Sequence, residues 1–224
     1  MDDVSEEPVF QGVRVANESD SGGVWGEPAL ADATAADGAR EVRREWLARQ
    51  WAAADEGTHV GVFAVLCAFS GLAAVVCALL KASVGVGVLA IVVAAPVAEE
   101  MSKAILPLMV LERRPWLFGS YATIVLVGAL SGLVFASIEN LLYFFLYIPG
   151  GSLTTGTILW RLFVCTALHV GCSTLVCSGL ARAWRKARAR LGEFEMSVAM
   201  PRLVAAVAIH GLYNFGVVLY SAVS

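Results

Sequence analysis

Five apolar stretches dominate the chain after residue 58, and short polar segments separate them. They run from about residue 60 to 80, 84 to 110, 119 to 147, 158 to 181 and 199 to 220. An α-helix rises about 1.5 Å per residue, so about 20 apolar residues cross a hydrocarbon core about 30 Å thick. The pattern therefore predicts an all-α, polytopic transmembrane bundle of about five spans, formed by residues 59–224.

The first 58 residues follow a different pattern. Residues 1–38 mix acidic, small and single apolar residues without periodicity, which predicts a disordered acidic cytosolic tail. Between residues 39 and 58, apolar Val42, Trp46, Leu47 and Trp51 lie among arginines at helical spacing. We expect an amphipathic juxtamembrane helix here, lying on the membrane surface. A short solvated helix that leads into the first span is the alternative interpretation.

Composition supports the membrane assignment. The chain is 58% hydrophobic and 16% charged, with a mean hydropathy of +0.72, which excludes an ordinary soluble domain. All five cysteines fall in apolar stretches and form no CxxC pair, so we expect them to pack rather than to form disulfides or bind metal. No cleavable signal peptide is expected, because no apolar segment precedes residue 59.

Positive charge predicts the orientation of the bundle. Arg113 and Arg114 lie between the second and third stretches, and residues 182–190 between the fourth and fifth are also strongly basic. Short basic loops stay in the cytoplasm, so both loops should be cytoplasmic. We therefore expect a multi-pass protein of the plasma membrane, with a cytoplasmic N-terminus and with Ser224 outside.

The second stretch contains ionisable residues in the sequence Pro-Val-Ala-Glu-Glu-Met-Ser-Lys. Each of Glu99, Glu100 and Lys103 costs on the order of 3 kcal/mol at the centre of a membrane, which makes this cluster a functional candidate. Both carboxylates can reach Lys103, at i+3 and i+4 on a helix. Pro96 lacks a backbone N–H, so it should free the carbonyl of Val92 and kink the helix beside the charges.

Polar residues also interrupt the last three stretches: Glu139 and Asn140 in the third, His169 in the fourth, and His210 and Asn214 in the fifth. At about 1.5 Å per residue, Glu139, His169 and His210 lie at one level near the middle of the membrane. The same count places Glu99 about two turns deeper, a mismatch that the span boundaries, helix tilt and the Pro96 kink leave open. We expect acidic and imidazole groups from four helices to meet at one polar, wet site halfway through the membrane.

Carboxylates and imidazoles in a wet pocket can polarise a water molecule for attack on an amide. His210 and Asn214 lie one turn apart and could donate hydrogen bonds to an oxyanion, as could Asn140. A second possibility is that the site binds a divalent metal such as zinc, with ligands from Glu99, Glu139, His169 and His210. Arg161 either supports the site or extends to the lipid headgroups.

These motifs resemble those of PrsW-type intramembrane proteases, which belong to the superfamily of CAAX prenyl endopeptidases. The resemblance covers about residues 84–220 and rests on Pro-x-x-Glu-Glu-x-x-Lys at 96–103, Phe-x-x-x-Glu-Asn at 135–140, Arg161 with His169, and His-x-x-x-Asn at 210–214. It implies an intramembrane endopeptidase that cuts a membrane protein or lipid-anchored peptide. In the best-known bacterial setting the substrate is a single-span anti-sigma factor.

Position by position, the resemblance implies that Glu99 and Glu100 are essential carboxylates, that Glu139 and His169 hold the water, and that His210 with Asn214 faces the oxyanion. Lys103, Asn140 and Arg161 would support them. CAAX-type relatives carry His where this chain has Glu139, so the general base, and the choice between a glutamate and a metal mechanism, stay open.

Two alternatives to a peptidase follow from the same residues. The cluster could hold together a non-catalytic scaffold that docks a partner, or it could serve a small ion-coupled carrier. The absence of an internal repeat argues against a carrier. The expected partners are the lipid bilayer and a membrane substrate, with no nucleic acid. The sequence predicts no oligomeric state.

Overall fold

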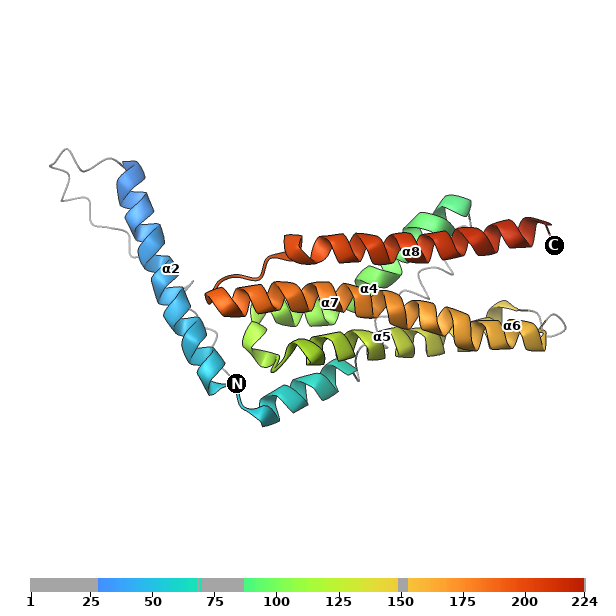
Figure 1. Cartoon of the computed structure of the whole chain (residues 1–224), viewed down its shortest axis with the longest axis horizontal. Helices are drawn as coiled ribbons and strands as arrows, with labels where there is room; N and C mark the ends of the chain where they lie inside the picture. Colours follow the sequence, from blue (N-terminus) through green and yellow to red (C-terminus); the bar gives the residue numbers. More distant parts are fainter. Residues whose placement is uncertain (1–27, 68, 70–86, 149–152, 224) are drawn as a thin grey trace. The chain divides into compact units, whose positions relative to one another are not determined.

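The computed structural model describes residues 28–67, 69, 87–148 and 153–223, and every regular element among them is helical. The chain divides into two compact units, Met1–Ala54 and Asp55–Ser224. Helix α2, Pro28–Ala53, is the described element of the first unit (Figure 1). All other labelled elements belong to the second unit.

Helix α2 is longer than the pattern predicted. It begins at Pro28, inside the range predicted to be disordered, and continues to Ala53 through the predicted amphipathic segment. Residues 28–38 are rich in alanine, the best helix former, and proline is well tolerated in the first turn of a helix. Local propensity therefore outweighs the missing periodicity there. Residues 1–27 of the predicted tail lie outside the described residues.

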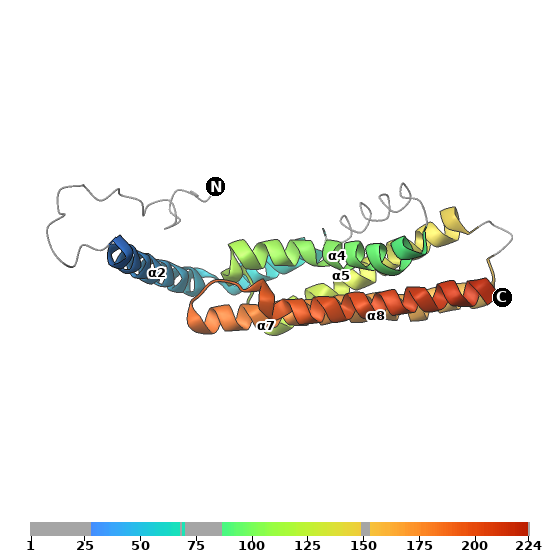
Figure 2. The same cartoon turned by 90° about the horizontal axis from the view of Figure 1, so that it is seen from above.

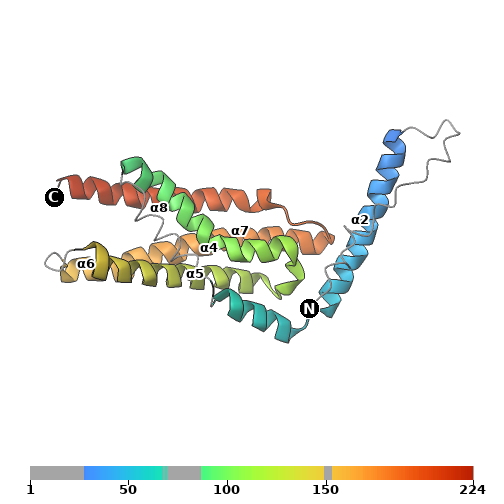
Figure 3. The ribbon, with the colours of Figure 1, turned by 180° about the vertical axis from the view of Figure 1, so that it is seen from behind.

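The second unit is a bundle of helices (Figures 1 and 3), and its long helices pass into π-helical segments. After a short helix, Glu56–Cys67, its elements are η2 (Ala90–Ala94), α4 (Ala95–Arg113), η3 (Pro115–Leu117), α5 (Tyr121–Leu142), η4 (Tyr143–Tyr147), α6 (Thr155–Trp160), η5 (Arg161–Cys165), α7 (Thr166–Arg190) and α8 (Met196–Val223). Elements η2, η4 and η5 are π-helices that adjoin α4, α5 and α7, and such segments frequently mark functional sites.

Three helices of the described residues are long and apolar enough to cross a membrane: Tyr121–Tyr147, Thr155–Arg190 and Met196–Val223. They correspond to the last three predicted spans, so the chain is an all-helical integral membrane protein. Helix α4 of 19 residues is not among them, because the charges of Glu99, Glu100 and Lys103 offset its apolar residues. Most of the predicted first span, residues 60–80, lies outside the described residues.

Glycines bring the backbones of the bundle into close contact. A Cβ atom on Gly132 of α5 would lie 2.5 Å from the carbonyl oxygen of His169 on α7, and one on Gly128 would lie 2.5 Å from Cβ of Cys177. Small residues at i and i+4 allow such close helix pairs in membranes. Helix α8 runs alongside α7 (Figures 1 and 2). His169 is therefore held between α5 and α8.

One end of the bundle is packed with large apolar side chains. Leu111, Phe118 and Trp184 are buried, and Nε1 of Trp184 donates to the carbonyl of Pro115 at 2.8 Å. This end also carries the basic loop residues predicted to be cytoplasmic. Cys165, Cys172 and Cys177 are buried free thiols and Cys67 is a partly buried one, whereas Cys77 lies outside the described residues.

Candidate active site

Helix α4 buries three ionisable side chains within one turn. Glu99 and Glu100 are 0% exposed and Lys103 is 3% exposed. Nζ of Lys103 donates to Oε1 of Glu100 at 2.5 Å, which is the i+3 pairing that the sequence allowed. The ring of Phe135 on α5 lies 4.5 Å from the same ammonium. Lys103 thus offsets the cost of burying one of the two carboxylates.

His210 on α8 contacts both carboxylates. Its Nδ1 lies 2.9 Å from Oε1 of Glu100, and its Nε2 lies 3.6 Å from Oε2 of Glu99. A carboxylate beside Nδ1 favours the tautomer that carries its proton there, so that Nδ1–H donates to Glu100. The lone pair of Nε2 then faces Glu99.

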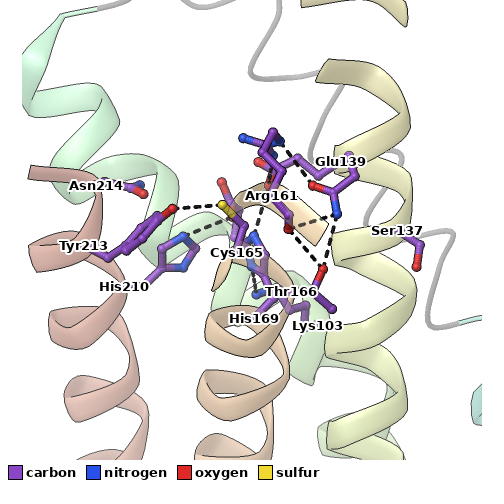
Figure 4. A network of polar contacts seen from close by, with 12 residues as sticks. Lys103, Ser137, Glu139, Arg161, Cys165, Thr166, His169, His210, Tyr213 and Asn214 are labelled. Carbon is purple, nitrogen blue, oxygen red and sulfur yellow. Dashed lines mark hydrogen bonds and ion pairs between the residues drawn. The ribbon is translucent and has the colours of Figure 1, made fainter. Parts of the chain in front are cut away.

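His169 on α7 lies between a cation and a carboxylate. Its Nδ1 is 3.1 Å from Nζ of Lys103, and its Nε2 is 3.0 Å from Oε2 of Glu139. An ammonium has only donors, so Nδ1 accepts and Nε2–H donates to Glu139. The rings of His169 and His210 lie 4.9 Å apart at 87°. Figure 4 shows His169, Lys103 and Glu139 together in one network.

Arg161 fixes Glu139 from the other side. Its Nη2 donates to Oε2 of Glu139 at 3.1 Å, its Nε donates to Oδ1 of Asn140 at 3.1 Å, and the ring of Tyr143 lies 3.4 Å from its Cζ. The Arg161 side chain is 12% exposed. Of the two predicted possibilities, the geometry therefore matches the supporting position and not an extension to the headgroups.

Asn140 and Asn214 donate to backbone carbonyls. Nδ2 of Asn140 donates to the carbonyl of Arg161 at 3.3 Å, and Nδ2 of Asn214 donates to the carbonyl of Ile91 at 3.0 Å. Figure 4 shows Asn214 apart from the cluster around His169. The two amides predicted as oxyanion donors thus contact the π-helical segments η5 and η2.

Oε2 of Glu99 lies 3.6 Å from Nε2 of His210, so the depth mismatch that the residue count left open is not present in the structure. The estimate counted a straight helix from Val84 along the membrane normal. In the structure the helix contains the π-helical segment Ala90–Ala94, and α4 crosses α7 obliquely (Figure 3). Residue count along an oblique, irregular helix does not convert directly into depth.

Comparison with known proteins gives a direct result. The model of the PrsW family of intramembrane metalloproteases matches residues 48–224. The chain belongs to the PrsW family. The match is longer than the predicted resemblance over residues 84–220, and the chain is accordingly a membrane peptidase, a hydrolase. Comparisons with curated proteins and with solved structures found no match.

The donor set fits the divalent metal that the PrsW family name implies. Glu99, His169 and His210 are buried and each offers a ligand atom, all within 4.8 Å of one another. Two histidines and a glutamate can hold a catalytic zinc ion and leave a position open for water. Glu100 at Nδ1 of His210 is the kind of carboxylate that orients a metal-binding imidazole.

Two details refine the predicted metal site. Glu139 was predicted as a ligand, but it is not part of the group of three and contacts His169 instead. Both nitrogens of His169 have partners, and the lone pair of Nδ1 becomes available to a metal only if this ring releases Lys103. In addition, Oε2 of Glu100 and Oγ of Ser173 are buried and have no hydrogen-bond partner in the described part of the protein. Buried polar atoms of this kind are commonly satisfied by a bound water or ion.

Sequence reasoning missed Tyr213. Its hydroxyl accepts from Nε1 of Trp160 at 2.7 Å and lies 2.8 Å from Sγ of Cys165, so it connects α8 to α6 and η5 near the histidines (Figure 4). A tyrosine in an apolar span carries no charge, and only its position between His210 and Asn214 could have drawn attention to it.

Replacing Lys103 by Met should destabilise the bundle, because Glu100 would lose its ammonium partner while staying buried. Removing one partner of a buried ion pair costs about 3 to 5 kcal/mol. The measurement is the thermal unfolding midpoint of the purified protein in detergent micelles.

Lys186→Met is the matched control. Lys186 and Glu195 pair at 2.6 Å beyond the apolar part of α7, where the hydrogen bond from Lys186 lowers the pKa of Glu195. Both side chains are partly exposed, so losing this pair should change the midpoint little. Equal midpoints for the wild-type protein and Lys103→Met would contradict a stabilising role for Lys103.

Proposed function

We propose that the chain hydrolyses a peptide bond of a membrane protein at the buried group of Glu99, His169 and His210. The observation that carries the proposal is that three helices direct these side chains to one point, with potential ligand atoms within 4.8 Å of one another. A small buried centre of this kind suits a water molecule that is polarised by a carboxylate and oriented by imidazoles. The substrate class that fits is a single-span protein, such as an anti-sigma factor, or a lipid-anchored peptide.

In the proposed reaction, Glu99 accepts a proton from the water while the water oxygen attacks the carbonyl carbon of the substrate. The carbon–nitrogen bond then breaks, and the proton passes from Glu99 to the leaving nitrogen, so the products are a carboxylic acid and an amine, which become a carboxylate and an ammonium by proton exchange. Glu100 holds His210 in place through Nδ1, and Glu139 holds His169 through Nε2. Each imidazole thus has a carboxylate that fixes its orientation.

In the metal alternative, Glu99 would be a ligand and not the proton acceptor: a divalent ion held by Glu99, His169 and His210, when bound, would act as a Lewis acid on the water and on the substrate carbonyl. The charges of the chain itself favour such an ion. Glu99 and Glu100 are fully buried beside His210, and a divalent ion bound there would offset part of the cost of burying carboxylate charge.

A non-catalytic scaffold and an ion-coupled carrier are the other two functions considered. Membership of a protease family favours the peptidase over both. A carrier would need a path for its ion across the membrane, whereas one end of the bundle is packed with buried Leu111, Phe118 and Trp184.

Glu99→Gln and Glu139→Gln should each abolish cleavage of a co-expressed single-span substrate while the protein still folds and inserts. Glutamine keeps the size of the side chain but cannot accept the proton or hold His169 as a carboxylate does. The measurement is the appearance of the cleaved substrate fragment on immunoblots. Glu112→Gln is the control, since Glu112 is exposed on the same helix and should retain full activity. Undiminished cleavage by both Glu99→Gln and Glu139→Gln would contradict the assignment of this site as the catalytic centre.

Purified protein should contain a divalent transition metal in stoichiometric amount, and His210→Ala should contain much less because one of three ligands is lost. Elemental analysis by mass spectrometry measures the content, and chelation should remove both metal and activity from the wild-type protein. Full activity in metal-free protein would contradict the metal mechanism and leave the glutamate mechanism.

We also propose five spans, with the N-terminus in the cytoplasm and residue 224 outside. The support is the positive charge around residues 113–114 and 182–190 together with the three apolar helices. Green fluorescent protein fused after residue 190 should fluoresce, and alkaline phosphatase fused after residue 224 should be active. The reverse pattern would overturn the orientation.

A further inference from the structure

The backbone changes register just before the catalytic carboxylates. In the π-helical segment Ala90–Ala94, the N–H of Ala95 bonds to the carbonyl of Ala90, in the i to i+5 pattern. In the same register the next carbonyl, that of Ile91, would need the N–H of residue 96. That residue is Pro96, which has no N–H.

Helix α8 supplies the missing donor. Nδ2 of Asn214 donates to the carbonyl oxygen of Ile91 at 3.0 Å. Near this bond the two backbones nearly touch, since a Cβ atom on Gly211 would lie 2.5 Å from the carbonyl oxygen of Val92. Helix α8 therefore places the amide of Asn214 beside the carbonyl that lacks a backbone donor. It also places Gly211, which has no side chain, where the two backbones come closest.

The other proline of α4 shows the same arrangement. Pro107 leaves the carbonyl of Lys103 without its usual i+4 donor. Oγ of Ser131 on α5 donates to that carbonyl at 3.2 Å. Each proline inside this charged helix is thus matched by a polar side chain from a neighbouring helix. Unsatisfied carbonyls are costly inside a membrane, which explains the matching.

We propose that Asn214 is a positioning residue that replaces the backbone donor missing at Pro96 and thereby fixes Glu99 and Glu100 relative to His210. The role in positioning rests on the proposed function, which places both carboxylates at the reaction centre. On α8, Asn214 holds the chain before Pro96, and His210 holds Glu100 after it at 2.9 Å. These two bonds lie one turn apart on α8 and clamp the irregular backbone between them.

This role differs from the oxyanion contact expected from the His-x-x-x-Asn motif. An oxyanion donor must point at the substrate carbonyl. The Asn214 amide nitrogen instead donates to a carbonyl of the protein itself, and Figure 4 shows it away from the network around His169 and Glu139.

A double-mutant cycle in the full-length protein tests the proposal. Asn214→Leu removes the donor, and Pro96→Ala restores a backbone N–H that can satisfy the carbonyl. We expect Asn214→Leu to lower the unfolding midpoint in detergent micelles, and we expect at least half of that loss to disappear in the Pro96→Ala background. Cleavage of a co-expressed substrate, lost in Asn214→Leu, should recover in part in the double variant.

Ser131→Ala is the matched control, because its acceptor is the carbonyl freed by Pro107. Its effect on the midpoint should be the same whether or not the protein also carries Pro96→Ala, and should shrink only with Pro107→Ala. Equal losses from Asn214→Leu with and without Pro96→Ala would overturn the proposal. Asn214→Leu could also reduce substrate cleavage without lowering the unfolding midpoint, and to the same extent with and without Pro96→Ala. That result would overturn the proposal and assign Asn214 to the oxyanion instead.

The unfolding midpoint reports the contribution of the Asn214 contact to stability even if no substrate is cleaved. A failure of the proposed function is therefore distinguishable from a failure of this inference. If Pro96→Ala does not accumulate, Asn214→Val provides a second test. Valine has no donor and no charge, so it should lower the midpoint about as much as leucine does. An unchanged midpoint for Asn214→Val would overturn the proposal.

Discussion

The cost of placing charge inside a membrane is the constraint on which the site depends. Glu100 is fully buried and bonded to Lys103 and His210, while Glu139 is bonded to Arg161 and His169. Each of these carboxylates thus has both a cation and an imidazole as partners. Three of these four partners, all except Lys103, lie on a different helix from the carboxylate that they contact, so neutralising the charges also packs the helices together. The polar network is accordingly part of the fold as well as of the chemistry.

Close backbone contact is what allows this network to form. Gly132 admits the carbonyl of His169, and Gly211 admits that of Val92. Asn214 then donates to the carbonyl of Ile91 in η2, and Asn140 adds a donor to the carbonyl of Arg161 in η5, which also accepts from the backbone N–H of Thr166. Irregular backbone at membrane depth needs such partners, because the bilayer offers no water. Side chains that a motif would assign to substrate contact serve the backbone here.

Family membership and geometry meet in the same residues. The PrsW family model covers residues 48–224, and the group of Glu99, His169 and His210 supplies a donor set suited to a metalloprotease. Lys103 contacts His169 at Nδ1, so an ammonium already lies within this group. A metal that used Nδ1 of His169 as a ligand would have to displace this ammonium.

The sequence by itself determined the helical class, the three described spans, the ionisable cluster and the family, because periodicity, apolar length and motif spacing are local properties of the chain. It predicted from the i+3 spacing that Lys103 could pair with Glu100, since both lie on one helix. Only the tertiary structure decided that Glu99 shares a level with His210 and that Asn214 faces Ile91. Those contacts depend on the crossing angles of the helices, on the π-helical register and on the close backbone contacts that glycines allow. Residue spacing within a single segment does not encode these features.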